Sequence, residues 1–180
     1  ATPIPRTLHM SLMELRDIST LTTPPVERRP VVTEVTPCQS PTIRRAIERE
    51  IDRGGQVYVL HNRVQDIDDV ANDIAALVPQ AKVVVGHGQM GGGALDSVMR
   101  SFVQGEADVL VSTTIVENGL DVPRANTMII RDANRFGLAQ LHQLRGRVGR
   151  SRERAFCYLM LPKNGVEDPT ALERLRTLER

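Results

Sequence analysis

Short apolar runs rich in β-branched residues alternate along the chain with segments whose apolar residues recur at helical spacing. The short runs predict strands at residues 31–35, 56–60, 82–85, 108–112, 127–130 and 155–161. The helical spacing predicts helices at residues 42–53, 67–78, 94–103 and 138–144. This alternation predicts an α/β fold with a mostly parallel central sheet flanked by helices on both faces. Ligands of such sheets gather at the carboxyl ends of the strands.

Turn-forming residues and apolar faces support these boundaries. Gly54 and Gly55 follow the first predicted helix, and Pro79 stops the second. One face of the helix at 94–103 carries Leu95, Val98, Met99 and Phe102. We therefore expect that face to pack against the sheet.

Both ends of the chain depart from the alternation. Three prolines within residues 22–30 indicate a linker. Near the other end, Leu172, Leu175 and Leu178 fall on one helical face. We divide the chain into the tail of a preceding domain (1–24), a linker (25–30), one complete domain (31–163) and the start of a truncated helical segment (164–180).

Composition limits the classes of function. The 180 residues carry a net charge of +1 and are 41% hydrophobic, which suits one domain with a sizeable core and demands no polyanionic partner. Cys38 and Cys157 form no metal or disulfide pattern, so we expect a reducing cytoplasm. The four histidines lack metal-ligand spacing and the apolar runs are strand-sized, so we expect no metal site and no membrane span.

Residues 143–150, Gln-Leu-Arg-Gly-Arg-Val-Gly-Arg, carry the most informative motif. It places Arg147 and Arg150 three residues apart, so we expect their guanidinium groups to leave neighbouring turns of a helix end on the same side. Gly146 and Gly149 keep the backbone slim enough for a bulky anion. Planar, permanently charged guanidinium groups suit a phosphoryl group. An arginine-rich helix end that faces water explains the spacing alone equally well.

Hydroxyl residues follow the predicted strand at 108–112. Thr113 and Thr114 stand where the strand ends, where hydroxyl and backbone N–H groups can hold a phosphate without adding charge. Gly119 and Asp121 then form a Gly-x-Asp whose carboxylate could accept from a sugar hydroxyl or order a metal-bound water. Taken alone, two threonines after a strand are more often a helix cap.

A glycine-containing loop follows the predicted strand at 82–85. Residues 86–90 read Gly-His-Gly-Gln-Met, and glycines at a strand exit let backbone N–H groups approach an anion. By itself, His87 in such a loop is more often a locally packed residue than a catalyst. Three glycines at 91–93 then start a helix without a capping residue.

The sequence lacks the groups that complete a nucleotide site. No Gly-x-x-x-x-Gly-Lys-Ser/Thr occurs, and neither Lys82 nor Lys163 follows a glycine. No Asp-Glu pair follows an apolar strand to hold magnesium. The chain therefore holds arginines for a triphosphate but only half of an active site.

Four segments together resemble motifs III, IV, V and VI of the superfamily 2 helicases, namely residues 2–8, 86–90, 112–121 and 138–150. The string from Gly137 to Ser151 is similar to the branch that contains RecG and the transcription-repair coupling factors (Mfd). Residues 16–19, 23–25 and 86–90 look more like the coupling factors than like RecG. The resemblance covers essentially the whole chain and departs at residues 91–93, where family members usually carry charged and polar residues.

The resemblance implies that the chain is the second RecA-like lobe of a motor, with the tail of the first lobe before it. In this family ATP lies between the lobes, and the first lobe supplies the phosphate loop and the carboxylates for Mg²⁺. The second lobe would supply Arg147 and Arg150 as fingers on the γ-phosphate, Gln143 as a relay of nucleotide state, and Gly146, Gly119 and Asp121 on the nucleotide side.

The resemblance also implies contacts with the backbone of double-stranded DNA. The residues that would make them are Thr113, Thr114, Gly86, His87, Gly88 and Gln89. Residues 164–180 would open the helical hairpin that links ATP turnover to translocation. The whole bacterial, cytoplasmic protein would displace stalled RNA polymerase and recruit excision-repair factors through other domains. The isolated lobe would be inactive.

Three alternatives accompany this interpretation. The chain could be the same lobe of the branch-migration helicase RecG, or a non-catalytic nucleic-acid-binding adaptor that kept the fold. A dinucleotide-binding enzyme needs Gly-x-Gly-x-x-Gly after the first strand, where this chain has Thr36-Pro37-Cys38, so we discount that class.

Overall fold

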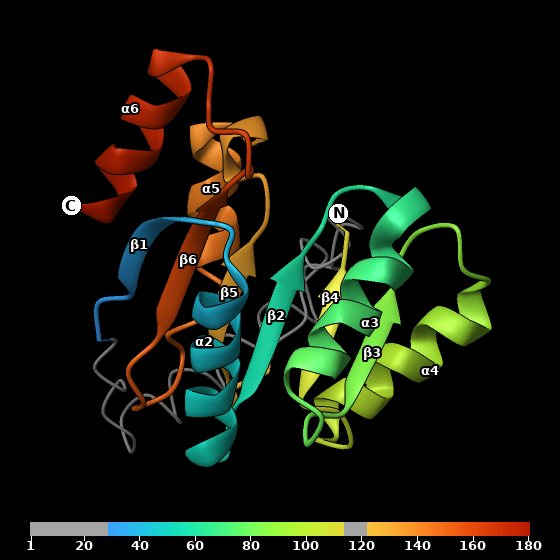
Figure 1. The fold of residues 1–180 in the computed structure, drawn as a ribbon. Coiled ribbons are helices and arrows are strands. Elements are labelled where there is room, and N and C mark those ends of the chain that lie inside the picture. The colour runs from blue at the N-terminus through green and yellow to red at the C-terminus, as the bar shows by residue number, and fades with distance from the viewer. Residues whose placement is uncertain (1–28, 114–121) are drawn as a thin grey trace, which may run out of the picture.

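The computed structural model describes residues 29–113 and 122–180, whose centre is one six-stranded sheet (Figure 1). Its strands are β1 (Val32–Pro37), β2 (Gln56–Leu60), β3 (Val83–Gly86), β4 (Val109–Ser112), β5 (Ala125–Ile130) and β6 (Phe156–Leu161). They lie in the order β1-β6-β5-β2-β4-β3, and every neighbouring pair is parallel. The predicted parallel sheet is confirmed.

The described residues also form five α-helices and two short 3-10 helices. The α-helices are α2 (Ser40–Asp52), α3 (Ile67–Leu77), α4 (Gly92–Val103), α5 (Leu138–Arg145) and α6 (Pro169–Glu179); the 3-10 helices are η1 (Val64–Asp66) and η3 (Ala133–Arg135). Each strand and helix predicted from the hydrophobic pattern is present, with ends that differ by one or two residues.

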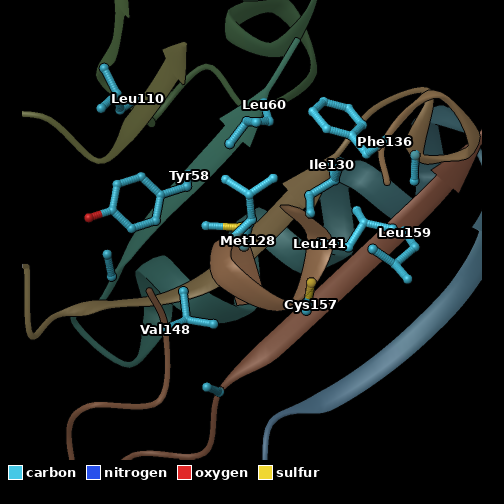
Figure 2. Packing of buried hydrophobic residues seen from close by; sticks show 14 of the residues in the cluster. Tyr58, Leu60, Leu110, Met128, Ile130, Phe136, Leu141, Val148, Cys157 and Leu159 are labelled. Atoms are coloured by element: carbon cyan, nitrogen blue, oxygen red, sulfur yellow. The ribbon is translucent and has the colours of Figure 1, made fainter. Parts of the chain in front are cut away.

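The strands bury side chains on both faces, so the sheet has two cores. Tyr58 and Leu60 face the core that α4, α5 and α6 complete. Val57 and Val59 face the opposite core, which α2 and α3 cover. Figure 1 shows α2 and α3 on one side of the sheet and α5 on the other, and Figure 2 shows Leu141 of α5 packed near Met128 and Ile130 of β5. Two covered faces explain why the strands read as nearly continuous apolar runs.

Helix α4 presents the apolar face that its spacing predicts. Phe102 is fully buried, and Val98 and Met99 pack against the same core. The helix begins after Gly91 without a side-chain cap, as the sequence predicts.

Helix α6 also buries its apolar face against the lobe. Leu175 and Leu178 belong to the core below α5, and the Glu179 carboxylate accepts from the Val35 amide of β1 at 3.0 Å. The predicted leucine face is therefore real and is covered by β1, η3 and α5. Its role as the opening of a helical hairpin stays a prediction.

No helix within the described residues has both the length and the apolarity needed to cross a membrane.

Candidate functional site

The carboxyl ends of four neighbouring strands meet at one edge of the sheet. Gly86 of β3 pairs with Ser112 of β4, which is level with Leu60 of β2, and Leu60 is level with Ile130 of β5. Thr113 follows β4 directly and is buried, with 8% of its surface exposed. The structure therefore brings Thr113 and the loop at 86–90 to the same edge, as the parallel topology predicts.

The loop after β3 folds back on itself. The amide of Gln89 donates to His87 Nδ1 at 3.2 Å, and the Met90 amide donates to the His87 carbonyl at 3.2 Å. Gly88 and Gln89 are exposed at the tip. His87 thus shapes the turn, and the exposed tip offers backbone and amide groups to a ligand.

A buried histidine lies beside Thr113 that we did not predict as a site residue. The His61 amide donates to the Ser112 carbonyl at 2.9 Å, so His61 extends β2 at the same edge. Its Nε2 is 2.7 Å from Asp66 Oδ1, and Arg63 Nη2 is 3.1 Å from Asp66 Oδ2. The hydrogen bond from His61 lowers the pKa of Asp66, helped by the Arg63 charge. A histidine directly after an apolar strand was the available signal.

The predicted arginines lie at the opposite edge. We call residues 146–155 the arginine loop, because it carries Arg147 and Arg150 between α5 and β6. A side chain at Gly149 would touch Val31 and Ala155, which lead into β1 and β6. The loop therefore sits at the amino ends of these strands, away from Thr113.

One expectation about this motif is wrong. Helix α5 ends at Arg145, and Gly149 takes a positive φ of 82°. Arg147 stands in the turn after the helix and Arg150 lies beyond Gly149, so the two side chains do not leave successive helical turns. A left-handed residue turns the chain away from the helix axis, which the spacing alone does not reveal.

The side chains of the arginine loop are differently exposed. Arg150 is exposed and Arg147 is half-buried, and each also interacts with another part of the chain. Gln143 is exposed on α5, and Gly146 is exposed where the helix ends. These four predicted residues therefore lie along one accessible stretch.

Arg145, the neighbouring arginine, is structural. Its guanidinium donates to the Leu178 carbonyl at 3.0 Å and contacts Thr33 Oγ1 at 3.5 Å. It thereby joins α5 to α6 and β1. Because the arginines stand close together in the sequence, the sequence does not show which of them are structural and which are accessible.

A second group that sequence reasoning missed is an ion pair between a buried carboxylate and a half-buried arginine, next to the arginine loop. Glu50 of α2 is 1% exposed and pairs with Arg53. The Arg53 guanidinium also donates to the Arg154 carbonyl at 2.6 Å. The available signal in the sequence was a glutamate at a core-facing position of the predicted helix, with an arginine three residues later.

Three predicted residues, Thr114, Gly119 and Asp121, lie outside the described residues. A polar cavity of about 610 Å³ lies between β1 and α2, and its lining contains none of the predicted site residues. Across 29–113 and 122–180, no group of three or more His, Cys, Asp or Glu side chains could hold a metal ion.

The family of the chain follows from a comparison with known domains. The model described as helicase conserved C-terminal domain matches residues 41–152, more than half of the chain. The chain belongs to this family. The matched stretch of the helicase C-terminal domain runs from α2 into the arginine loop and includes the loop at 86–90 and Thr113.

Curated relatives extend the match over nearly the whole chain. The transcription-repair-coupling factor of Bacillus subtilis is 52% identical over 179 residues, and that of Myxococcus xanthus is 50% identical over 179 residues. Each match covers 99% of this helicase C-terminal domain chain but 15% of the relative. The chain thus corresponds to a small part of these longer proteins.

Solved structures show the same fold. RecG bound to a three-way DNA junction is 37% identical with a TM-score of 0.74, covering 99% of this chain and 24% of RecG. The C-terminal domain of the DEAD-box protein Dbp5 has a TM-score of 0.58 at 14% identity, covering 83% of each chain, which shows the fold alone. The predicted RecA-like three-layer fold is confirmed.

The described donors at the arginine loop fit a phosphate better than a metal ion. Arg147 and Arg150 are permanent cations whose N–H groups suit phosphoryl oxygens. The carboxylate on this loop, Glu153, faces the Arg53 guanidinium at 4.0 Å. Magnesium needs oxygen ligands, so the described cationic groups of this loop suit an anion rather than a metal ion.

Proposed function

We propose that this chain is the second motor lobe of an ATP-dependent translocase that moves on double-stranded DNA in transcription-coupled repair. The observation that carries the proposal is the 50–52% identity to transcription-repair-coupling factors over 99% of the chain. The lobe places the arginine loop at one edge of the sheet, and Thr113 with the loop at 86–90 at the other. This separation allows nucleotide and DNA to be bound at the same time.

In this proposal, ATP binds between this lobe and a preceding lobe that holds the phosphate loop and Mg²⁺. Arg147 and Arg150 meet the γ-phosphate, where they stabilise the charge that spreads over the phosphoryl oxygens during transfer. Gln143 relays the nucleotide state along α5. The nucleotide side is completed by Gly146, Gly119 and Asp121. The isolated lobe, lacking the first half of the site, is inactive.

DNA lies at the carboxyl edge in this proposal. Thr113, Thr114 and the loop of Gly86, His87, Gly88 and Gln89 contact the phosphate backbone, which fixes register without reading sequence. Other domains of the cytoplasmic bacterial protein contact RNA polymerase and excision-repair factors.

Arg150→Ala in the full protein tests the arginine-finger assignment. We expect ATP turnover to fall by about 10³-fold or more, because the transition-state charge loses its partner. ATP binding measured by a fluorescent analogue should stay within about threefold. Arg152→Ala, which removes another exposed arginine of the same loop, is the matched control and should leave turnover nearly unchanged. Normal hydrolysis by Arg150→Ala removes the assignment.

RecG-like activity is the second candidate, favoured by the TM-score of 0.74 with the junction-bound RecG. The two candidates differ in the DNA that stimulates turnover. Plain duplex should stimulate the coupling-factor motor as well as a three-way junction does. Stimulation confined to the junction would favour the RecG-like function.

A further inference from the structure

The Glu50 carboxylate is buried inside the lobe and fully engaged. Its Oε1 accepts from Thr127 Oγ1 at 2.7 Å and from Arg53 Nη2 at 2.8 Å, and its Oε2 accepts from Arg53 Nε. The hydrogen bond to Glu50 raises the pKa of Arg53. A buried carboxylate is tolerated only when donors surround it, so this arrangement holds the Arg53 guanidinium in one orientation.

The backbone around Glu50 is shaped to hold it. The Gly55 amide donates to the Glu50 carbonyl at 2.8 Å, and any side chain at Gly55 would overlap the Glu50 carboxylate. Gly55 also lies against the Arg124 carbonyl that leads into β5. The groups that surround the Glu50 carboxylate therefore come from α2, from the turn into β2 and from the start of β5.

The same guanidinium reaches outward to the arginine loop. Arg53 Nη2 donates to the Arg154 carbonyl at 2.6 Å, and Nη1 lies 4.0 Å from Glu153 Oε2. The guanidinium carbon is 5.5 Å from the centroid of the Phe156 ring. One side chain thus links the buried carboxylate to the end of the loop.

Within the arginine loop, the stretch from Gly149 to Arg154 is fixed at its first residue by packing. A Cβ at Gly149 would lie 3.0 Å from Val31 Cγ2 and 3.5 Å from Ala155 Cβ, so the chain at Gly149 passes close to both. Between these ends, the Glu153 amide donates to Ser151 Oγ at 3.1 Å. Arg150 therefore projects from a short segment that is held at both ends.

We propose that Arg53, fixed by Glu50, is a positioning residue that sets where Arg150 stands and hence how well Arg150 meets a phosphoryl group. This inference rests on the proposed function. Arg53 contacts the loop backbone and not the nucleotide. A small displacement of a group that acts only in the transition state costs rate while leaving ground-state binding intact.

The first variant is Arg53→Lys in the full protein. An ammonium can still neutralise Glu50, so the fold is kept, but it lacks the planar fork that binds Glu50 and the Arg154 carbonyl together. We expect kcat for ATP to fall about 10–100-fold with KM changed about twofold or less. Arg44→Ala is the matched control, because Arg44 pairs with Glu48 at 3.0 Å on the exposed face of the same helix, and its kcat should match wild type.

A double-mutant cycle separates positioning from general damage. The readout is the affinity for ADP with aluminium fluoride, a transition-state analogue, with thermal unfolding as the check on folding. If Arg53 acts through Arg150, then Arg53→Lys weakens analogue binding in the wild-type background and has no further effect in Arg150→Ala. Losses that add in the double variant overturn the inference, as does wild-type kcat in Arg53→Lys.

The failures are distinguishable. Wild-type turnover and analogue binding in Arg150→Ala remove the arginine-finger assignment and the inference together. Loss in Arg150→Ala with none in Arg53→Lys removes the inference alone. Should Arg53→Lys unfold at a lower temperature, kcat is compared at a temperature where both proteins are fully folded; a loss of kcat there supports the inference and wild-type kcat overturns it.

Discussion

At the scale of single residues, the carboxyl edge holds a hydrogen-bonded carboxyl group, Asp66, that makes stability depend on pH. His61 lowers the pKa of Asp66 below its ordinary value of 3.8 through their hydrogen bond, with Arg63 adding to the effect. A carboxyl group whose pKa is lower in the folded state stabilises the fold above its unfolded pKa. That contribution is lost as the pH falls below 3.8 through the lower folded value.

We therefore expect Asp66→Asn to lower the unfolding temperature at pH 7 and to lose this deficit as the pH falls toward 3. Thermal unfolding by circular dichroism across this range measures it. Asp73→Asn, at an exposed position of α3, should show no such pH-dependent difference. A deficit that persists unchanged at pH 3 contradicts the role of the Asp66 charge.

The two cysteines should differ sharply in reactivity. Burial raises the pKa of Cys157 to about 12, although the nearby Arg145 charge opposes the shift. The thiolate is the reactive form, so Cys157 should be inert in the folded chain, whereas the half-buried Cys38 is accessible. Iodoacetamide at pH 8 should add one label to the native chain, at Cys38, and two labels in denaturant, as counted by mass spectrometry. Native labelling of Cys157 would show that this core opens readily.

At the scale of elements, two glycines should respond to alanine in opposite directions. Gly149 has a φ of 82° and lies against Val31, so Gly149→Ala should destabilise the lobe by about 1–3 kcal/mol. Gly93 stands inside α4 with open space around it, so Gly93→Ala should stabilise by about 0.5–1 kcal/mol. Urea unfolding measures both.

Gly165→Ala is the control for the backbone cost. Gly165 also has a positive φ, of 79°, but no atom lies within 4 Å of an added Cβ. Its cost should therefore be smaller than that of Gly149→Ala, and the excess at Gly149 reports the contact with Val31, just before β1. An equal loss of stability at the two positions would show that packing of the arginine loop does not cause the loss at Gly149.

Helix α5 connects the two ends of the sheet. It begins after β5 and η3, near the carboxyl edge, and ends where the arginine loop meets the amino ends of β1 and β6. Leu141 (Figure 2) anchors it to the core, and so does Leu144. A rigid helix between the two edges is the structural element through which nucleotide and DNA binding would be coupled in the proposed motor.

At the scale of the whole molecule, the arginine loop carries cationic side chains, and the described residues contain no group of three or more His, Cys, Asp or Glu that could hold a metal. We expect the isolated chain to hydrolyse ATP negligibly and the chain joined to its preceding lobe to regain turnover. A coupled-enzyme assay measures both. Turnover by the isolated chain that Arg150→Ala abolishes would contradict the two-lobe site.

DNA binding by the isolated chain should be weak, roughly tens of micromolar or worse, since half a motor makes few phosphate contacts. Fluorescence anisotropy over a salt series checks this. Tight binding with a steep salt dependence would instead favour the adaptor.

The order of apolar and polar residues determined the elements and the class of fold. Strands buried on both faces must be apolar throughout, and the helices that cover them must be apolar at every third or fourth position. Each pattern can therefore be read within a single segment of the sequence. Positions 113 and 86–89 were placed correctly at strand ends for the same reason, because the end of an apolar run marks the end of a strand.

Tertiary structure alone decided which of these residues are neighbours. The strand order brings β3 beside β4 and β1 beside β6, so Thr113 meets the loop at 86–90 while Arg150 lies at the other edge. The close approach of Gly149 to Val31, the bond from Thr127 to Glu50 and the bond from Arg53 to the Arg154 carbonyl join segments far apart in sequence. Such contacts have no signature in a local pattern, because each partner satisfies its own local rules.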